Sequence, residues 1–432
     1  MQIQKARKGY KLVKSLFGKY EETPEDWIVS SIKDLGNIVT GNTPDTSVQE
    51  YYGNDVLWAS PTDLGFTKYV NTTKNKLSLK GYKISRQIPS KSILVVCIGS
   101  TIGKIGIATQ NMSSNQQINS IICKEDDNEY VYYQILFNSQ KIQNMANNVA
   151  VPILNKNDFG TIKIYKPKNI QEQQKIASIL SNIDSLISQT QKEIEHTQRL
   201  KKGLMQKLLT RGIGHTKFKK IKTLYGKYEE IPEDWEYRKL SDLAKVKGGK
   251  RLPKGEPFSL IKTEHPYLRV TDFRNYGINE SNLKYISSKI FQKIKNYTIS
   301  SDDVYISIAG TIGLAGLIPE SLDGANLTEN AAKITNLQEI KKEYLSILLN
   351  SELIQNQIKS YLGKTSQPKL ALFRIEKLEL PLPSIQEQQK IASILSNVDS
   401  QIQKQQEHKS KLESLKKGLM QKLLTGQIRV KV

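Results

Sequence analysis

The sequence predicts an α+β protein, with two α/β modules at opposite ends of an antiparallel coiled coil of two long helices related by a pseudo-twofold axis. Three observations support this fold class. GKYEETPEDW at residues 18–27 returns as GKYEEIPEDW at 226–235. QEQQKIASILSNID at 171–184 returns almost unchanged at 386–399. The two long stretches between the repeated blocks scarcely resemble each other. One shared frame therefore carries two different inserts.

The order of the parts predicts the pairing of the helices. The expected segments are an N-terminal strap (1–27), a first insert (28–168), a long helix (169–212), a second strap (213–235), a second insert (236–383) and a second long helix (384–427). Because each insert precedes its own helix, antiparallel pairing places the inserts at opposite ends and leaves the second strap a short gap to cross. Parallel pairing would place both inserts at one end and leave linkers that are too short.

The long helices are predicted from their periodicity. From 176 to 208, and again from 391 to 423, seam positions recur at alternating steps of four and three residues. This spacing is typical of a coiled coil, here apolar at both ends and polar in the middle. Gly203 and Gly418 occupy the same register inside the two helices. Their recurrence indicates either a close backbone approach at a helix crossing or simple tolerance of glycine, which costs about 1 kcal/mol relative to alanine.

The ends of these helices are marked by capping residues. Asn-Ile-Gln-Glu at 169–172 and Ser-Ile-Gln-Glu at 384–387 have the spacing of capping boxes, each shortly after a proline. Gly212 and Gly426 follow the last apolar turns and suit C-terminal caps. Each helix is then about 40 residues and about 60 Å long.

The two inserts are expected to share a fold while differing in their loops. Both mix short β-rich runs with turns and short helices, and a few landmarks recur in both. Gly41 in TGNTP corresponds to Gly249 in GGKRLP, and GSTIG at 99–103 corresponds to AGTIG at 309–313. A common fold with different loops predicts two different ligands of one class.

The composition narrows the class of those ligands. The formal net charge is +22 and the pI is about 9.6, which indicates a polyanionic partner and favours nucleic acid. The longest apolar run, near 93–98, is far shorter than the ~20 residues that cross a bilayer. No apolar signal core follows the basic N-terminus, and Cys97 and Cys123 stand alone. We therefore expect a cytoplasmic protein with no membrane segment, disulfide framework or zinc site.

Polar and basic loop residues are the candidate DNA contacts. Lysine and arginine neutralise phosphates, whereas asparagine, glutamine and arginine read base edges. For any single position, a solvated loop residue remains the simpler interpretation. The candidates are Asn42, Thr43, Lys68, Lys74, Lys76, Ser100, Lys104 and Gln116 in the first insert, and Lys247, Lys250, Arg251, Lys254, Arg274, Lys284, Lys293 and Lys364 in the second.

The motifs that would indicate catalysis are missing from the sequence. GSTIGK at 99–104 has only three residues between its glycines and no Ser or Thr after the lysine, so it is not a P-loop. There is no GxGxxG, HExxH or GxSxG, and the four histidines are scattered. We therefore predict a binding protein with no catalytic, cofactor or metal residues.

Taken together, the repeats resemble the specificity subunit of type I restriction–modification enzymes, commonly called HsdS. The resemblance covers essentially the whole chain and is carried by PEDW at 24–27 and 232–235, IQEQQKIASILSNxD at 170–184 and 385–399, and KKGLMQKLLT at 201–210 and 416–425. It implies two target-recognition domains, each reading one half of an interrupted double-stranded DNA sequence. It also implies that the helices dock two modification subunits, which methylate adenine, and that restriction subunits add translocation and cleavage. S-adenosylmethionine, ATP and Mg²⁺ would then be held by partner subunits and not by this chain.

In this interpretation the coiled coil sets the spacer between the half-sites, and its exposed faces form the partner surface. The residues expected on that surface are Gln173, Gln174, Lys192 and Arg199. Two other classes stay open. One is an enzyme: the chain would be the specificity subunit of a type IIB-like restriction enzyme, or an insert would contain nuclease chemistry. The other is a basic coiled-coil scaffold that binds DNA without reading its sequence, although a scaffold needs no divergent inserts.

Overall fold

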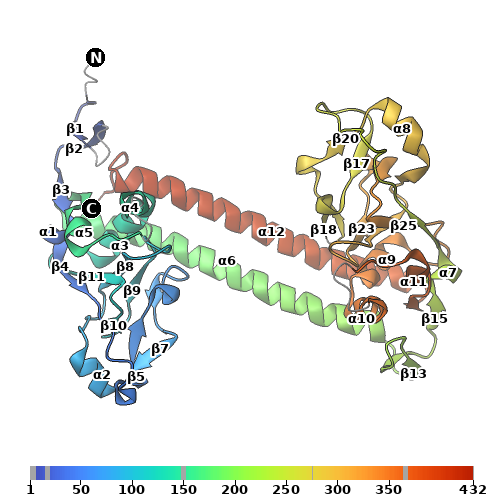
Figure 1. Cartoon of the computed structure of the whole chain (residues 1–432), viewed down its shortest axis with the longest axis horizontal. Coiled ribbons are helices and arrows are strands. Elements are labelled where there is room, and N and C mark those ends of the chain that lie inside the picture. Colours follow the sequence, from blue (N-terminus) through green and yellow to red (C-terminus); the bar gives the residue numbers. More distant parts are fainter. Residues whose placement is uncertain (1–5, 15–19, 147–151, 275, 363–367, 432) are drawn as a thin grey trace. The chain divides into compact units, whose positions relative to one another are not determined.

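The computed structural model describes residues 6–14, 20–146, 152–274, 276–362 and 368–431 (Figure 1). The chain divides into two units. The first contains Met1–Gln191 and Glu407–Val432, so it is built from both ends of the sequence, and the second is the continuous stretch Lys192–Gln406. Within the described ranges, none of the helices combines the length and the apolar character needed to cross a membrane.

Two long helices begin in one unit and end in the other. Helix α6 spans Ile170–Arg211 and helix α12 spans Ile385–Leu424, so each begins within one residue of the start predicted from its capping box. The Asn169 side chain accepts a hydrogen bond from the backbone N–H of Gln171 at 2.9 Å. Gly212 and Gly426 follow the helix ends with φ of 61° and 72°, the left-handed conformation predicted for these caps.

The first unit consists of small sheets and short helices around two clusters of buried apolar residues. Two of its sheets are two-stranded: the hairpin β1 (Tyr10–Lys14) and β2 (Tyr20–Pro24), and the pair β3 (Trp27–Ser31) and β12 (Lys163–Pro167). A five-stranded sheet has the order β4 (Gly36–Thr40), β11 (Ile118–Cys123), β8 (Ile93–Val96), β9 (Ile105–Ala108) and β6 (Tyr69–Val70). A three-stranded sheet has the order β10 (Ser113–Ser114), β5 (Tyr52–Ala59) and β7 (Asn75–Leu77). Its short helices are α1 (Ile32–Leu35), α2 (Leu79–Ile84), α3 (Asn128–Phe137), α4 (Ser139–Ala146) and α5 (Lys156–Thr161).

The core of the first unit includes parts of both long helices. Strand β8 is buried along its whole length, which explains its unbroken apolar sequence. The strap residue Trp27 is fully buried in the cluster that contains Ile93 and Val95 of β8. Leu180 from the beginning of α6 and Leu423 from the end of α12 pack there as well. The beginning of one long helix therefore shares a core with the end of the other.

The second unit repeats this plan. Three of its sheets are two-stranded: the hairpin β13 (Phe218–Lys222) and β14 (Tyr228–Pro232), the pair β15 (Glu236–Lys239) and β26 (Glu379–Leu382), and the pair β18 (Phe273–Arg274) and β19 (Gly277–Ile278). One four-stranded sheet has the order β16 (Lys245–Gly248), β25 (Ala331–Thr335), β22 (Val304–Ser307) and β23 (Ala315–Leu317). The other has the order β20 (Lys284–Tyr285), β17 (Pro266–Leu268), β24 (Ala325–Leu327) and β21 (Thr298–Ile299). Its short helices are α7 (Leu240–Leu243), α8 (Ser288–Ile294), α9 (Lys342–Leu349), α10 (Glu352–Tyr361) and α11 (Leu372–Glu376).

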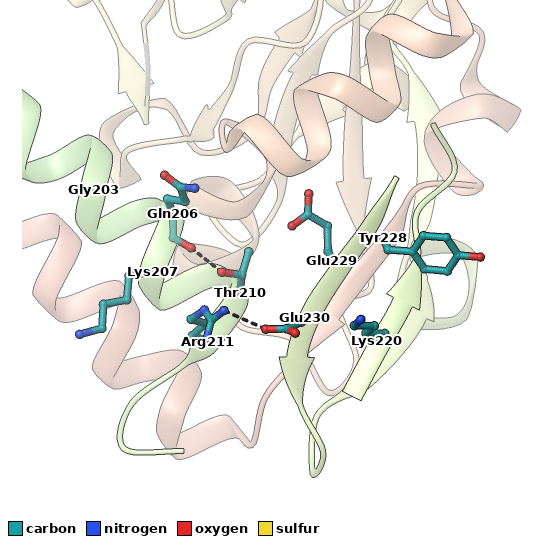
Figure 2. A pocket seen from close by; sticks show the side chains of 9 residues that line it. All are labelled: Gly203, Gln206, Lys207, Thr210, Arg211, Lys220, Tyr228, Glu229 and Glu230. Atoms are coloured by element: carbon teal, nitrogen blue, oxygen red, sulfur yellow. Dashed lines mark hydrogen bonds and ion pairs between the residues drawn. The ribbon is translucent and has the colours of Figure 1, made fainter. Parts of the chain in front are cut away.

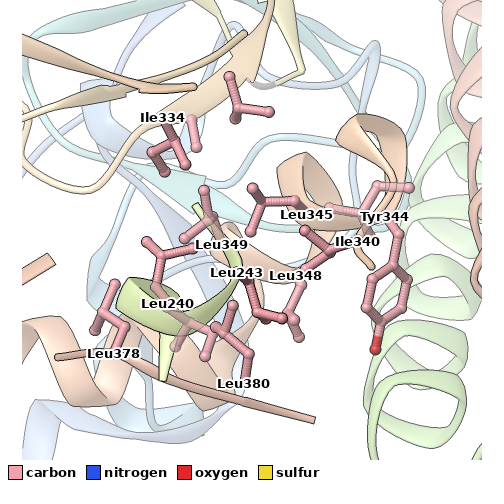
Figure 3. Close-up of a cluster of buried hydrophobic side chains, with 14 of the residues drawn as sticks. Leu240, Leu243, Ile334, Ile340, Tyr344, Leu345, Leu348, Leu349, Leu378 and Leu380 are labelled. Atoms are coloured by element: carbon pink, nitrogen blue, oxygen red, sulfur yellow. The ribbon is translucent and has the colours of Figure 1, made fainter. Parts of the chain in front are cut away.

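The core of the second unit forms where α7, α9 and β26 meet. Figure 3 shows Leu240, Leu243, Leu345 and Leu380 facing one another in this cluster. The same cluster contains Leu208 and Leu209 from the end of α6, together with Ile391 and Leu395 from the beginning of α12. As in the first unit, one helix beginning and one helix end are held in a single core.

The recurring glycines have different explanations. A Cβ on Gly41 would lie 2.2 Å from the carbonyl oxygen of Asn115, and one on Gly249 would lie 2.1 Å from that of Thr328. These two positions are therefore determinants of the shared fold, as predicted. Gly203 and Gly418 have no atom within 4 Å of a built Cβ, so the predicted close approach at a helix crossing is wrong. Simple tolerance of glycine on an exposed helix surface is consistent with the structure.

Candidate DNA-binding and partner-docking sites

Three of the candidate residues in the first insert lie together. The Thr43 hydroxyl donates to the Gln116 amide oxygen at 2.6 Å. The neighbouring Asn42 side chain accepts the backbone N–H of Arg86 at 2.7 Å. Arg86 was missed by sequence reasoning because only the fold brings it beside the loop that follows β4. The cluster combines amide, hydroxyl and guanidinium groups, which are the groups that read base edges.

Lys68 does not fit its predicted role. Its side chain is only 8% exposed, and its ammonium group donates to Glu129 at 2.8 Å, to Ser181 at 2.9 Å and to Tyr133 at 3.2 Å. Burial alone would raise the pKa of Glu129, but hydrogen bonds from Lys68 and Tyr69 hold that pKa below its ordinary value of 4.5. The prediction that Lys68 contacts phosphate is therefore wrong, because this ammonium group already ties its loop to α3 and α6.

The other candidates of the first insert are wholly or partly exposed. Lys74 and Ser100 are exposed, whereas Lys76 and Lys104 are half-buried. The Lys104 ammonium group lies 5.0 Å from the centre of the Phe66 ring, and Phe66 is itself 78% exposed. These side chains are therefore accessible to a ligand.

Four candidates of the second insert, Lys250, Arg251, Lys284 and Lys293, lie on or beside β17, β20 and α8. Arg251 forms an ion pair with Glu329 at 2.6 Å, and Lys293 forms one with Glu256 at 2.8 Å, so both are partly neutralised. Lys250 lies 5.6 Å from the centre of the Tyr297 ring. Lys247, Lys254 and Arg274 are exposed, Lys284 is half-buried, and Lys364 lies outside the described residues.

The positive charge of the second insert is concentrated in this region. Residues 236–380 contain 22 Lys and Arg against 16 Asp and Glu, a net charge of +6. Residues 249–297 alone contain ten basic and four acidic residues, which is also a net charge of +6. The remainder of the insert is therefore electrically balanced, and a polyanion would be attracted chiefly to this one region.

Gln173 does not belong to a partner surface. It is only 2% exposed, and its amide group bonds to the backbone N–H of Asp127, the carboxylate of Asp126 and the carbonyl of Pro167. Its counterpart in the repeat, Gln388, is also fully buried. The predicted docking role of Gln173 is therefore wrong, because this glutamine fixes the beginning of its helix to the insert. Gln174, Lys192 and Arg199 are exposed.

The glutamates of the two predicted capping boxes, Glu172 and Glu387, do not bond to the backbone at the start of their own helices. Their carboxylates instead accept hydrogen bonds from the straps or from Arg429, which is bonded to a strap. Glu172, whose side chain is 3% exposed, receives two hydrogen bonds from Arg429, at 2.6 and 2.8 Å. Arg429 also donates twice to Asp26 of the strap, at 2.8 Å each. The hydrogen bond to Glu172 is the largest cause that raises the pKa of Arg429 further above its ordinary value.

The second unit has an equivalent junction built from other groups. Glu387 accepts the backbone N–H of Ile213 at 2.8 Å and the indole N–H of Trp235 at 3.0 Å. Nε2 of His215 lies 3.0 Å from Glu387, and Nδ1 of the same ring lies 3.2 Å from Asp234. His215 therefore occupies the place that Arg429 holds in the first unit.

A lysine–aspartate pair joins the two long helices within each unit. In the first unit Lys416 lies 2.6 Å from Asp184, and in the second unit Lys201 lies 2.6 Å from Asp399. Both the lysines and the aspartates are 215 positions apart in the sequence, so the two pairs are the same contact made by opposite copies. In each unit the lysine belongs to the late part of one helix and the aspartate to the early part of the other.

A polar groove lies beside the end of α6 in the second unit. Figure 2 shows it between the last turns of α6 and the β13–β14 hairpin, where Arg211 forms a 2.8 Å ion pair with Glu230. Its volume is about 580 Å³. It is lined by Gly203, Gln206, Lys207, Thr210, Arg211, Lys220, Tyr228, Glu229 and Glu230. A groove of about 810 Å³ in the first unit is lined in part by the repeat counterparts Gln421, Lys422 and Thr425.

Among the residues that the structure describes, no group of three or more His, Cys, Asp and Glu is placed to hold a metal ion. Burial raises the pKa of the Cys97 and Cys123 thiols to about 12, so both stay protonated at neutral pH.

Comparison with known proteins identifies the class. The family model described as type I restriction modification DNA specificity domain matches the chain twice, over residues 24–196 and 232–414. Each match covers one insert together with most of the helix that follows it. The chain therefore belongs to the family of type I restriction–modification DNA specificity subunits.

Individual relatives agree along nearly the full length. The MjaVIII and MjaIX specificity subunits of type I restriction enzymes from Methanocaldococcus jannaschii are 28% and 27% identical, and each alignment covers 94% of both chains. Among solved structures, the type I restriction–modification S subunit from M. genitalium is similar with a TM-score of 0.56 at 17% identity, over 92% of this chain and 96% of that one. A chain from a structure on complex assembly and conformational transition of a type I system gives 0.59 at 13% identity, over 94% and 99%. These structures support the same fold.

Proposed function

We propose that this chain is the non-catalytic DNA-specificity subunit of a type I restriction–modification complex, in which each insert reads one half of an interrupted DNA target. The observation that carries the proposal is the double match to the specificity family, on two units that share a plan and differ in their loops. A shared plan with different loops is what reading two unlike half-sites requires. The proposed target-recognition domains are residues 28–168 and 236–383.

The two long helices are proposed to pair antiparallel along their length and to set the spacer between the half-sites. The equivalent pairs Lys416–Asp184 and Lys201–Asp399 support this arrangement, because an antiparallel pseudo-twofold produces the same contact twice. Half-sites about one duplex turn apart would then face the same side of the DNA. The straps, 1–27 and 213–235, connect the helices to the inserts.

The partners follow from the same proposal. Two modification subunits would dock on the exposed helix faces, including Gln174, Lys192 and Arg199, and restriction subunits would join the complex. S-adenosylmethionine, ATP and Mg²⁺ would be held by those subunits, and the complex would act in the cytoplasm. The proposed DNA contacts are the candidate residues that remain accessible, joined by Arg86.

The deciding experiment is a map of adenine methylation in host cells with and without this gene. Loss of one interrupted motif on deletion would support the proposal and reveal both half-sites. Exchange of one insert for that of a relative should then change one half-site only, whereas insertion of residues into both helices should change the spacer. A swap that altered both half-sites together would contradict the modular arrangement.

A further inference from the structure

The loop between β16 and β17 carries two adjacent apolar side chains in full contact with solvent. Leu260 is 103% exposed and Ile261 is 74% exposed. Among the described residues, Leu260 is the most exposed of the large apolar side chains. A single exposed leucine is ordinary on a protein surface, whereas contiguous exposed apolar side chains mark contact surfaces.

The tip is fixed to the body of the insert. The backbone N–H of Ser259 donates to the carbonyl of Tyr285 at 2.8 Å, and the Ser259 hydroxyl donates to the carbonyl of Ile261 at 2.8 Å. One residue before this turn, Phe258 packs edge-on against Tyr267 with ring centres 5.5 Å apart. The loop therefore packs the partly buried Phe258 against the body of the insert and presents the apolar pair Leu260 and Ile261 outward on a defined support.

The loop that carries the tip is basic on balance: residues 249–265 contain Lys250, Arg251, Lys254 and Lys262 against Glu256 and Glu264. Lys254 and Lys262 flank the tip in the sequence, and both are exposed. The stretch 249–297, which contains the tip, holds the whole net charge of the second insert. An apolar tip with flanking lysines is suited to a polyanion that also offers apolar surface, and the grooves of duplex DNA do so through base edges and thymine methyl groups.

The corresponding loop of the first unit carries no such pair. This loop, residues 41–51 between β4 and β5, differs in sequence from residues 249–265 between β16 and β17, and none of its residues is an exposed large apolar side chain. A partner bound equivalently by both units would need the same surface twice. A surface present in one insert only is instead suited to the ligand that differs between the inserts, which is the DNA half-site.

We propose that Leu260 and Ile261 form an apolar reading tip that enters a DNA groove within the half-site of the second insert and packs against base edges. Lys254 and Lys262 bind the phosphates on either side. This proposal rests on the proposed function and assigns to the tip one part of the discrimination that the second insert performs.

The test uses the full chain assembled with its modification subunits, and a duplex carrying the interrupted motif found by the methylation map. The double variant Leu260→Ser with Ile261→Ser should bind this duplex about tenfold more weakly for each side chain removed from the interface. Its salt dependence should be unchanged. Lys254→Gln with Lys262→Gln should weaken binding to all duplexes and lower the salt slope by about two. Leu224→Ser, at an exposed leucine of the strap, is the matched control and should bind as the wild type does.

Replacing each base pair of the motif in turn locates the contact. The tip variant should lose discrimination at one or two adjacent base pairs of one half-site and keep full discrimination at the other, which also shows that the variant complex is folded. The proposal is overturned if the tip variant binds and discriminates as the wild type does. It is also overturned if the variant loses a modification subunit instead of DNA affinity. A wild-type complex that reads no interrupted motif would refute the proposed function itself, whereas a normal wild type with an unaffected variant refutes the tip alone.

Discussion

Replacing Arg429 with alanine should destabilise the first unit more than a surface ion pair would suggest. Arg429 is 40% exposed, but its partner Glu172 is only 3% exposed and receives two hydrogen bonds from the guanidinium group. The variant would leave a buried carboxylate without its cation. Removing one partner of a fully buried pair costs about 3–5 kcal/mol, and water entering at the exposed arginine side reduces this to about 2 kcal/mol.

That free energy corresponds to a measurable shift in unfolding temperature. For a unit of about 200 residues, about 2 kcal/mol lowers the midpoint by about 6 °C. Scanning calorimetry of the full chain at neutral pH and low salt would measure this shift. Arg429→Lys should lose less than Arg429→Ala, because lysine keeps the charge but cannot make the paired bonds.

A double-variant cycle tests the stated cause. Glu172→Gln removes the buried charge, so adding it to Arg429→Ala should restore part of the lost stability. If the double variant is as unstable as Arg429→Ala alone, the unpaired carboxylate is not the cause. If Arg429→Ala melts with the wild type, the junction contributes nothing measurable to the stability of the unit.

Three further predictions concern the same framework. Glu129→Gln should reduce the loss of unfolding free energy that accompanies acidification. A carboxylate with a lowered folded-state pKa contributes its full stabilisation above its ordinary pKa of 4.5 and loses it as the pH falls through the lowered pKa. Denaturant unfolding at neutral and acid pH would measure this difference in unfolding free energy. Lys201→Asp should destabilise the second unit by about 1–2 kcal/mol, and adding Asp399→Lys should restore most of it in denaturant unfolding. Cys97 and the half-buried Cys123 should resist alkylation at neutral pH until the chain unfolds, and rapid labelling of the native protein would contradict the raised pKa of these thiols.

The features that could be predicted from the sequence are those encoded by neighbouring residues. The long helices and their caps follow from a four–three periodicity and from glycines at fixed offsets, and both are local. The fold landmarks Gly41 and Gly249 were recognisable because the chain contains two copies to compare.

The errors concern side chains whose surroundings come from distant segments. Lys68 is on a loop, but its acceptors come from α3 and α6, so its sequence neighbours gave no sign of burial. Glu172 has the spacing of a capping box, yet its partner Arg429 is 257 residues away. The burial of Gln173 could have been suspected, because the same glutamine recurs as Gln388 beside a repeated glutamate. For the DNA contacts, the sequence supplied candidates and the structure reduced them.

The division of the first unit between both ends of the chain has a consequence for the order of folding during synthesis. The second unit is one continuous stretch, so its core can close before the last residues are made. The first unit lacks the end of α12 until the residues up to Leu424 have been synthesised, because its core includes Leu423 and Leu424 from that helix. The amide of Gln134 likewise has to wait for the carbonyl of Leu424, 290 residues later. The module synthesised first is therefore the last to be finished, and loss of the C-terminal segment would damage the N-terminal module before the second one.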